Sequence, residues 1–230
     1  MIVAVAGGKG GVGKSTVALN LARELEGVAV DADLSTADLP QGDGPGLHEV
    51  LAGRVDPIDA VEPVGSTRVL SCGRTLAGAR AADVSELIPA VRRLERESDH
   101  VVVDCPAGLA RDVGTVLHCA DLTVLVTTPD RSALTDAFRT RELALDLETP
   151  VAAVVLNRSS AESERITDRV EATFQAPVTV LAERSSIEDA RRVGKPVRDV
   201  RPKATVLEAF ERVARTIERC DRSGIGVGRR

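Results

Sequence analysis

The stretch "AGGKGGVGKST", residues 6–16, decides the fold of this 230-residue chain. Within it, Gly8, Gly13, Lys14 and Ser15 match the spacing G-x-x-x-x-G-K-[ST]. The match stands after a short apolar run and opens a helical pattern, which is the context that a phosphate-binding loop needs. Glycines let successive backbone N–H groups turn toward a phosphate, and the helix N-terminus adds a favourable dipole. The alternative interpretation is a flexible glycine turn between a strand and a helix.

The rest of the chain alternates short apolar runs with longer helical patterns. The apolar runs are rich in β-branched residues and lie at 2–6, 28–32, 67–71, 100–104, 122–127, 151–157 and 177–181. Continuous apolar runs of this length are typical of strands that are buried on both faces. Helical patterns stand between them, at 15–26, 84–97, 131–147, 162–174 and 204–220. This alternation predicts an α/β fold with a doubly wound, mostly parallel sheet and helices on both of its faces.

Length and charge limit the organisation of the chain and its partners. A single P-loop domain over residues 1–220 is expected, followed by a flexible tail at 221–230, and "LPQGDGPG" (39–46) is the clearest loop. Thirty basic and thirty-five acidic residues give a net charge of -5, so any binding to nucleic acid or an anionic membrane needs a local patch. Tyrosine and tryptophan are absent, which argues against an aromatic platform for stacking bases.

Cysteine usage and hydropathy indicate a cytoplasmic protein. The four cysteines are widely scattered and form no C-x-x-C pair, so a zinc or iron–sulfur site is not expected; they are Cys72, Cys105, Cys119 and Cys220. Packing as small buried hydrophobes in a reducing compartment is the favoured interpretation. The opening "MIVAVAGG" becomes glycine-rich too early for a signal peptide, and no apolar run reaches the length of a membrane span.

The loop implies specific roles for its polar side chains and requires a carboxylate nearby. Lys14 would contact the β- and γ-phosphates of a nucleotide, and the Ser15 hydroxyl would ligate Mg²⁺. Asp104 follows three apolar residues, and Asp31 and Asp33 stand together at the end of another apolar run. Carboxyl ends of parallel strands form the edge where ligands bind, so these carboxylates could hold the metal shell or orient a water. Helix capping or a turn is the alternative for each.

Five segments together resemble the MinD/ParA family of P-loop ATPases. "GKGGVGKST" (8–16) resembles the deviant Walker A signature of that family, in which Lys9 is the signature lysine. "DADL" (31–34) resembles its switch I, and "DCPAG" (104–108) resembles the switch II of MinD-like members. "VVLNR" (154–158) is similar to the segment that carries an adenine-reading asparagine, and residues 180–197 are similar to a further family stretch. The resemblance extends from residue 2 to about residue 217.

The resemblance implies a SIMIBI-type fold, ATP and Mg²⁺ as cofactors, and an ATP-dependent homodimer. Lys9 would reach across the dimer to the partner's nucleotide and act with Lys14, like an arginine finger. Asp33 would position the attacking water, Ser15 and Asp104 would hold Mg²⁺ directly or through water, and Asp31 would support that shell. The residues implied in nucleotide binding are Gly8, Gly10, Gly11, Val12, Gly13, Lys14, Ser15, Thr16, Asn157 and Arg158.

Three positions depart from the family pattern. Ala182 stands where the family usually has proline, and Arg184 stands where it has aspartate. Asp38 replaces an asparagine that many MinD relatives carry in switch I. These departures concern the contacts on the adenine side and the contacts across the dimer.

Two versions of the switch remain open, one working at a membrane and one on DNA. The helical pattern at 204–220 mixes acidic and basic residues on its polar face, unlike a membrane-surface helix, so we expect it to dock on the core. A basic cluster could contact DNA, with a solvated surface as the alternative; it comprises Arg191, Arg192, Lys195, Arg198, Arg201 and Lys203.

The local match of "DCPAG" favours a MinD-like ATPase that dimerises with ATP and hydrolyses it to position a cellular structure such as the division site. A protein activator or adaptor is expected, and a membrane surface would be reached peripherally through it. The alternatives are a ParA-type ATPase that binds DNA non-specifically, and an ATP-gated interaction module with little turnover.

Overall fold

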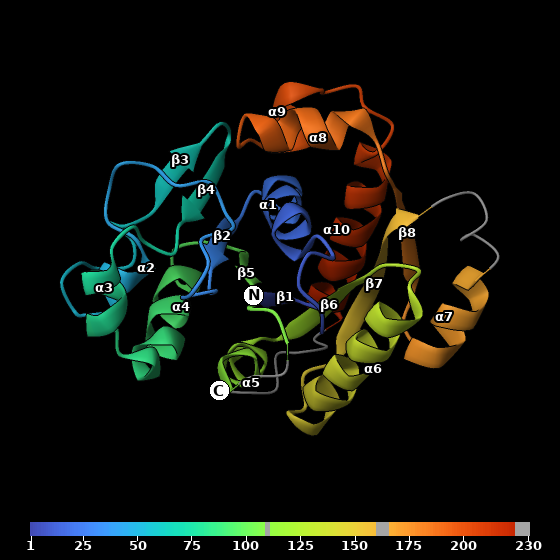
Figure 1. Ribbon diagram of the computed structural model, residues 1–230, viewed down its shortest axis with the longest axis horizontal. Coiled ribbons are helices and arrows are strands. Elements are labelled where there is room, and N and C mark those ends of the chain that lie inside the picture. The colour runs from blue at the N-terminus through green and yellow to red at the C-terminus, as the bar shows by residue number, and fades with distance from the viewer. Residues whose placement is uncertain (109–110, 160–165, 224–230) are drawn as a thin grey trace.

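Strands from the whole length of the chain form one eight-stranded sheet in the computed structural model, which describes residues 1–108, 111–159 and 166–223 (Figure 1). The strands are β1 (Ile2–Ala6), β2 (Val28–Asp31), β3 (Glu62–Val64), β4 (Thr67–Leu70), β5 (Val101–Asp104), β6 (Leu122–Thr127), β7 (Val151–Ser159) and β8 (Val178–Ala182). Their order across the sheet is β3-β4-β2-β5-β1-β6-β7-β8. Neighbouring strands pair in parallel except β3 and β4, which form an antiparallel hairpin. The predicted mostly parallel α/β fold is therefore confirmed.

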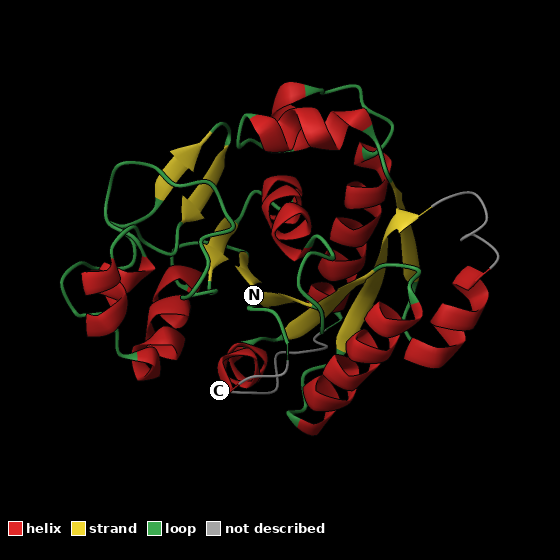
Figure 2. Ribbon diagram, viewed as in Figure 1, coloured by secondary structure: helices red, strands yellow, loops and turns green. Residues whose placement is uncertain are grey.

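Helices cover both faces of this sheet (Figure 2). They are α1 (Lys14–Glu24), α2 (Leu47–Leu51), α3 (Leu76–Ala81), the 3₁₀ turn η1 (Val84–Glu86), α4 (Leu87–Glu95), α5 (Arg111–Cys119), α6 (Arg131–Asp146), α7 (Thr167–Phe174), α8 (Ser185–Arg192), α9 (Val197–Val200) and α10 (Leu207–Arg222). Helices α1, α9 and α10 pack on one face, whereas α4, α5 and α7 pack on the other. The terminal helix α10 lies against α1, β7 and β8, as expected for a helix docked on the core.

The apolar runs are continuous because alternate side chains of each strand enter two different cores. In β1, Ile2, Ala4 and Ala6 join one hydrophobic cluster, and Val3 and Val5 join the other. Side chains that alternate between the faces of a strand must all be apolar when both faces are covered. The continuous apolar runs in the sequence thus follow from a sheet that is covered by helices on both faces.

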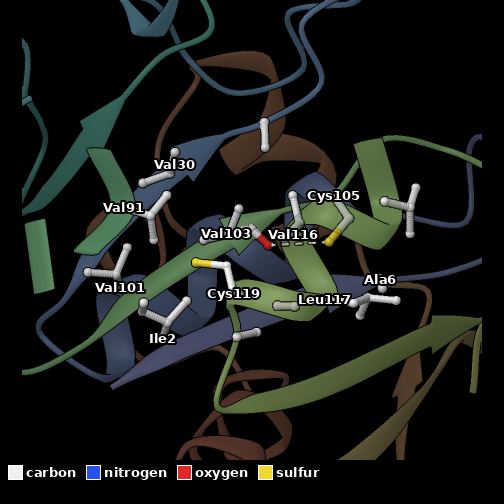
Figure 3. Close-up of a cluster of buried hydrophobic side chains, with 14 of the residues drawn as sticks. Ile2, Ala6, Val30, Val91, Val101, Val103, Cys105, Val116, Leu117 and Cys119 are labelled. Atoms are coloured by element: carbon white, nitrogen blue, oxygen red, sulfur yellow. Dashed lines mark hydrogen bonds between the residues drawn. The ribbon is translucent and has the colours of Figure 1, made fainter. Parts of the chain in front are cut away.

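Three of the cysteines are buried, and two of them, Cys105 and Cys119, belong to this packing. Figure 3 shows Cys105 and Cys119 among Ile2, Val103 and Val116, where α5 lies over β1 and β5. Cys72 is also buried, beside β4. Their surroundings fit the role of small hydrophobes that the sequence indicates.

Some elements differ from the sequence-based expectations. Helix α5 was not expected, because Gly114 and β-branched residues lower helix propensity there; burial of Val116 and Leu117 against the sheet overrides that preference. The helix expected at 84–97 begins with the 3₁₀ turn, and its α-helical part starts just before Pro89, which the first turn of a helix tolerates.

Strand β3 and the short helices α2, α3, α8 and α9 were not expected either. Two further differences concern chain segments near the gaps in the described range. The helix expected at 162–174 starts in the structure at Thr167, and residues 160–165 lie outside the described residues. Helix α10 runs to Arg222, so it includes the first two residues of the tail expected at 221–230. Residues 224–230 of that tail lie outside the described range.

Candidate functional site

The glycine-rich loop connects β1 to α1 in a conformation that requires glycine at its end. Gly13 has a φ of 101°, in the left-handed region, and its carbonyl accepts the hydrogen bond of Val17 N–H. A Cβ at this position would collide with the side-chain amide of Asn157. Lys14 follows as the first residue of α1 and is buried. Glycine is therefore needed at position 13 both for the backbone conformation of the loop and for its close contact with Asn157.

Carboxylates from two neighbouring strands lie beside this loop. Strands β2 and β5 pair in parallel, and their register places Asp31 directly opposite Asp104 at the carboxyl ends. Ser15 and Lys14, at the start of α1, lie close enough to the Asp104 carboxyl to lower its pKa. The structure thus brings together Lys14, Ser15, Asp31 and Asp104, which are separated in sequence by up to 90 residues.

Asp104 is buried without full hydrogen bonding. Asp104 is only 1 % exposed, and its Oδ1 atom has no hydrogen-bond partner within the described part of the chain. Burial raises the pKa of this carboxyl to about 8, and the negative charge of Asp31 adds to the rise. Ser15 and Lys14 lower the pKa, although by less than burial raises it. A buried acceptor left open in this way is suited to a cation or a ligated water.

Asp31 has the opposite hydrogen-bonding environment. Its Oδ1 atom accepts the N–H of Asp33 at 3.2 Å, and its Oδ2 atom accepts the N–H groups of Asp38 at 3.0 Å and Leu39 at 3.1 Å. Burial raises its pKa to about 7, and these three N–H groups oppose the rise. One carboxylate therefore ties together both ends of the loop over residues 33–39. The metal-supporting role expected for Asp31 comes with a structural role that the sequence did not indicate.

Asp33 and Lys9 lie farther out, on the surface of the site. The Oδ1 atom of Asp33 accepts the hydroxyl of Ser35 at 2.6 Å and the N–H groups of Ser35 and Thr36 at 3.1 Å each. This is a local turn of the kind weighed as the alternative for aspartate. Lys9 is exposed, and its Nζ atom donates to the hydroxyl of Ser132 at 3.3 Å. Within the described part of the chain, neither side chain forms a hydrogen bond with Ser15 or Asp104.

Asn157 contacts the glycine-rich loop directly. Its Nδ2 atom donates to the carbonyl of Val12 at 2.8 Å, and its Oδ1 atom accepts the N–H of Arg158. Asn157 is buried, and the next residue, Arg158, is exposed with a φ of 53°. The Asn157 amide thus fixes the position of the glycine-rich loop, and Arg158 lies on the surface.

A cavity of about 390 Å³ opens over the glycine-rich loop. It extends from the start of α1, past the loop that Asp31 ties together, to α8 and the turn after it. The lining residues are Gly11, Gly13, Lys14, Ser15, Thr16, Leu19, Asn20, Asp38, Leu39, Pro40, Arg158, Ile187, Ala190, Arg191, Gly194 and Lys195. Lys14 lines the cavity from the start of α1, and α8 with the turn after it contributes both apolar side chains, such as Ile187, and the basic residues Arg191 and Lys195.

The wall formed by α8 was not identified residue by residue from the sequence. Ile187, Ala190 and Gly194 lie within residues 180–197, the stretch that resembles the MinD/ParA family, and that resemblance was the available signal. Leu39 and Pro40 fall in the loop predicted at 39–46. Apolar residues in loops and in a charged helix give no periodic pattern that would mark them as a binding wall.

A second hollow, of about 340 Å³, lies on the outer side of the glycine-rich loop. Lys9, Gly10, Val12 and Thr128 contribute to its lining, together with Asp130. Gly11 and Arg158 line both hollows, so the loop separates a cavity that contains Lys14 from one that contains Lys9. The two lysines of the motif therefore face different spaces.

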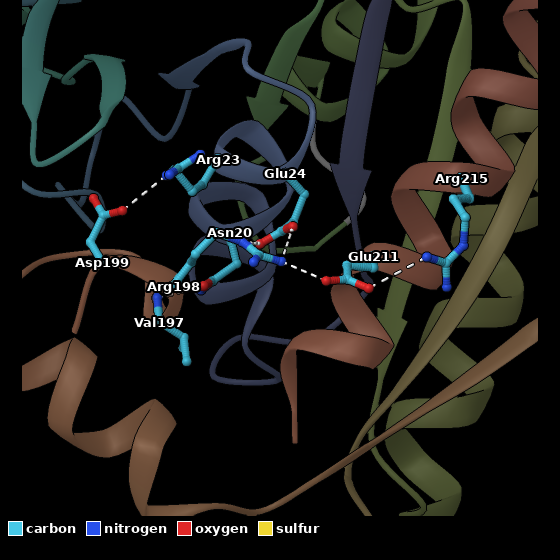
Figure 4. A network of polar contacts seen from close by, with 8 residues as sticks. All are labelled: Asn20, Arg23, Glu24, Val197, Arg198, Asp199, Glu211 and Arg215. Atoms are coloured by element: carbon cyan, nitrogen blue, oxygen red, sulfur yellow. Dashed lines mark hydrogen bonds and ion pairs between the residues drawn. The ribbon is translucent and has the colours of Figure 1, made fainter. Parts of the chain in front are cut away.

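The basic cluster of the C-terminal third is largely paired with carboxylates. Arg191 binds Glu188, and Arg192 and Arg201 bind Asp189. Figure 4 shows Arg198 between Glu24 and Glu211, facing into the protein. These pairs offset part of the positive charge that the sequence suggested, although the side chains of Arg191, Arg192 and Arg201 remain exposed.

Hydropathy of the helices gives one further result. Within the described ranges, none of the helices combines the length and the apolar content needed to cross a membrane.

Comparisons with known proteins agree with this geometry. A family model of the ParA group, described as an NUBPL iron-transfer P-loop NTPase, matches residues 1–194. An uncharacterised ATP-binding protein of Methanocaldococcus jannaschii is 33% identical, over 94% of this chain and 88% of its own length. The crystal structure of the cell division ATPase MinD of Pyrococcus furiosus aligns with a TM-score of 0.86 and 29% identity, covering 95% of this chain and 98% of that chain.

A second solved structure is the septum site-determining protein MinD of Pyrococcus horikoshii, in complex with Mg-ADP. It aligns with a TM-score of 0.86 and 27% identity, covering 99% of both chains. The match to the family model, the identity to the archaeal ATP-binding protein and the arrangement around the glycine-rich loop lead to one conclusion: the chain belongs to the ParA family of P-loop NTPases, together with the MinD and ParA ATPases.

Proposed function

We propose that this protein is a Mg²⁺-dependent ATP hydrolase that works as a MinD-type switch. The observation that carries the proposal is that Lys14 and Ser15 line a cavity of about 390 Å³ and both act on the buried carboxyl of Asp104 next to it. A lysine, a hydroxyl and a buried carboxylate at the carboxyl edge of a parallel sheet are the groups that a P-loop NTPase uses for a nucleotide and its metal. Relatives that are titled ATP-binding protein and MinD with Mg-ADP support ATP and Mg²⁺ as the cofactors.

The residues present fit a magnesium ion. Mg²⁺ prefers oxygen ligands and is usually held by one or two carboxylates or hydroxyls together with waters and substrate phosphates. Ser15 supplies a hydroxyl, and Asp104 supplies a buried carboxylate oxygen that lacks a partner among the described residues. When bound, the ion would supply positive charge to the phosphate oxygens. Asp31 would support this group through its place opposite Asp104 in the sheet.

The chain's own groups account for nucleotide binding. The loop from Gly8 to Gly13 presents backbone N–H groups to phosphate oxygens, and Lys14 places its ammonium group at the β- and γ-phosphates. Thr16 lines the same end of the cavity. The wall at α8 would contain the nucleoside, because Ile187 and Ala190 offer apolar surface to a base in the same cavity that Lys14 lines. Arg158 would close the side between the two hollows.

Hydrolysis would use two residues at the margin of the site. Asp33 would orient the attacking water, which requires its carboxylate to exchange the turn around Ser35 for a water contact. Lys9 would act on the nucleotide of a second copy of the chain, where its charge stabilises the negative charge that develops in the transition state. Its exposure and its separate hollow support a role outside its own cavity. ATP binding and dimerisation would then be coupled.

The switch would position a cellular structure through a protein activator or adaptor, in the cytoplasm or peripherally at a membrane. The ParA-type alternative receives less support, because Arg191, Arg192, Arg198 and Arg201 each pair with a carboxylate, which offsets part of the charge that would attract DNA. Iron transfer, which the family description mentions, is not carried over to this chain. Its cysteines form no C-x-x-C pair, and Cys72, Cys105 and Cys119 are buried.

The test combines turnover, assembly and surface binding. Wild-type protein should hydrolyse ATP only with Mg²⁺, Lys14→Ala should lose nucleotide binding, and Asp33→Ala should accumulate as an ATP-bound dimer in size-exclusion chromatography with light scattering. The trapped dimer is then sedimented with anionic liposomes and separately with duplex DNA, with ATP or ADP. ATP-dependent pelleting with liposomes would support a MinD-type ATPase that works at a membrane. Retention on DNA alone would favour a ParA-type ATPase, and binding to neither surface would indicate a protein adaptor. No turnover with any partner would leave an ATP-gated module.

A further inference from the structure

The wall of the cavity at α8 has few contacts of its own with the core. Within α8 only Ala190 is buried, and the helix contacts α9 along the chain. Gly194, in the turn between them, approaches Pro40 of the opposite wall. The position of this wall therefore depends on how α9 is attached to the rest of the protein.

Three consecutive residues of α9 each bind α1. The backbone N–H of Val197 donates to the Oδ1 atom of Asn20 at 2.8 Å. Arg198 donates to both carboxylate oxygens of Glu24, through Nε at 2.8 Å and Nη2 at 2.6 Å. The next contact joins the Nε atom of Arg23 to the Oδ1 atom of Asp199 at 2.9 Å. Figure 4 shows these three contacts, which we call the α1–α9 contact set.

The α1 side of the contact set leads directly to the phosphate-binding loop. Asn20, Arg23 and Glu24 are spaced i, i+3 and i+4, so they lie on one face of α1. Asn20 also donates from Nδ2 to the carbonyl of Thr16 at 2.8 Å, and Thr16 lies in the first turn of the helix. The helix that begins at Lys14 is thus the same element that holds α9 in place.

The contact set is more rigid than an ordinary surface pair. The Glu24 side chain is 7 % exposed, and its bidentate pairing with Arg198 fixes the orientation of both groups. Arg198 also donates to Glu211 of α10 at 2.7 Å, and these carboxylates raise the pKa of its guanidinium group. Asp199 accepts the N–H of Ser66 at 2.7 Å as well, which adds the β3–β4 turn.

We propose that Asn20, Glu24 and Arg198 are positioning residues that hold the nucleoside-side wall of the cavity at a fixed distance from the phosphate loop. This inference rests on the proposed nucleotide site. The phosphates bind at the start of α1 and the nucleoside lies against α8, so the α1–α9 contact set determines whether both ends of one ligand fit at once. Its loss weakens binding of a whole nucleotide and leaves binding of the phosphate chain alone intact.

The experiment compares two ligands that share only the phosphate chain. Affinities for ATP and for inorganic tripolyphosphate, each with Mg²⁺, are measured by competition against a fluorescent ATP analogue. Arg198→Gln should weaken ATP binding by about tenfold and change tripolyphosphate binding by less than about twofold. Arg198→Lys, which keeps the charge but not the bidentate geometry, should lie between Arg198→Gln and wild type. The matched control is Arg215→Gln, which removes a contact of 3.4 Å to Glu211 in the same network without touching α9.

The outcomes separate this inference from the proposed function. Unchanged ATP affinity in folded Arg198→Gln, or an equal loss for both ligands, would overturn the positioning role. Failure of wild-type protein to bind ATP would instead refute the proposed function. If Arg198→Gln does not fold, Glu24→Gln is judged by the same comparison, because it replaces the carboxylate that pairs with Arg198 by a neutral amide of the same size.

Discussion

Asp31 and Asp104 lie directly opposite each other on strands β2 and β5, and they differ in how their carboxylates are bonded. Asp31 accepts three backbone N–H groups, whereas one oxygen of Asp104 has no partner among the residues that the structure describes. Two buried carboxylates side by side favour protonation, and the pKa of each is raised. The first is satisfied by the fold, and the second needs a ligand.

Asp104→Asn should stabilise the protein in the absence of nucleotide and Mg²⁺. The carboxyl is protonated in both folded and unfolded chains below about pH 4, so it has no effect there. Above the unfolded value of 3.8, only the unfolded chain ionises until the folded pKa of about 8 is reached, so the free energy of unfolding falls as pH rises. The advantage of the variant should grow from pH 5 to pH 8, because the wild-type protein loses stability over that interval and the asparagine does not titrate. Urea unfolding in EDTA measures it, and a difference independent of pH would contradict the prediction.

Asp31→Ala should have the opposite effect, because it removes the acceptor of the N–H groups of Asp38 and Leu39 and leaves them unpaired. We expect a loss of about 1 to 3 kcal/mol in the free energy of unfolding. Hydrogen exchange at the amides of Asp38 and Leu39 should accelerate in the same variant. Asp38→Asn is the matched control, since the exposed side chain of Asp38 takes no part in these bonds. Equal exchange in both variants would remove the role assigned to Asp31.

Asn157→Ala tests whether this amide supports the loop or reads a base. Because Asn157 bonds the carbonyl of Val12 and lies against Gly13, its removal should loosen the phosphate-binding loop. ATP and inorganic tripolyphosphate should then lose affinity by the same factor, about tenfold, measured by competition binding. Ser159→Ala, on the same strand, should change neither affinity. A loss confined to ATP would restore the adenine-reading interpretation.

Lys9→Ala should reduce ATP hydrolysis by about tenfold or more while changing the free energy of unfolding by less than about 0.5 kcal/mol. The exposed side chain contacts Ser132 weakly, so little folding energy depends on it. Mixing Lys9→Ala with Asp33→Ala should restore part of the activity, because each chain supplies what the other lacks across a dimer. Ser132→Ala serves as the control. Absence of recovery in a mixture that forms dimers would show that Lys9 does not act in trans.

Alkylation of the native protein should modify Cys220 before the other cysteines. Burial raises the pKa of the Cys72 thiol to about 12 and that of Cys119 to about 11, and it also raises the pKa of Cys105. Thiolates are the reactive species, so these three buried thiols should react slowly. Mass spectrometry after a short exposure to iodoacetamide gives the order. Early modification of Cys105 would indicate opening between α5 and the sheet.

The sheet and the phosphate loop could be predicted from sequence because their signals are local. Apolar runs report burial on both faces, and the spacing from Gly8 to Ser15 reports the loop and the start of α1. The approach of Asp104 to Ser15 also follows, because parallel strands align their carboxyl ends.

The remaining features depend on contacts between distant residues. Nothing in the sequence near Asp31 indicates that it binds the N–H of Leu39, and the pairing of Glu24 with Arg198 joins residues 174 positions apart. Arg198 was grouped with a surface patch because its neighbours in sequence are basic. Only the packing of α9 on α1 directs it inward.

Strand β3 ends the sheet on one side with only three residues, Glu62, Pro63 and Val64. Proline has no N–H to donate, and so short an edge offers few groups to an incoming strand. This edge is therefore protected against the strand-to-strand addition that leads to aggregates and fibres. Concentrated protein should resist that kind of self-association at β3, and copies of the chain that meet productively must do so through other surfaces.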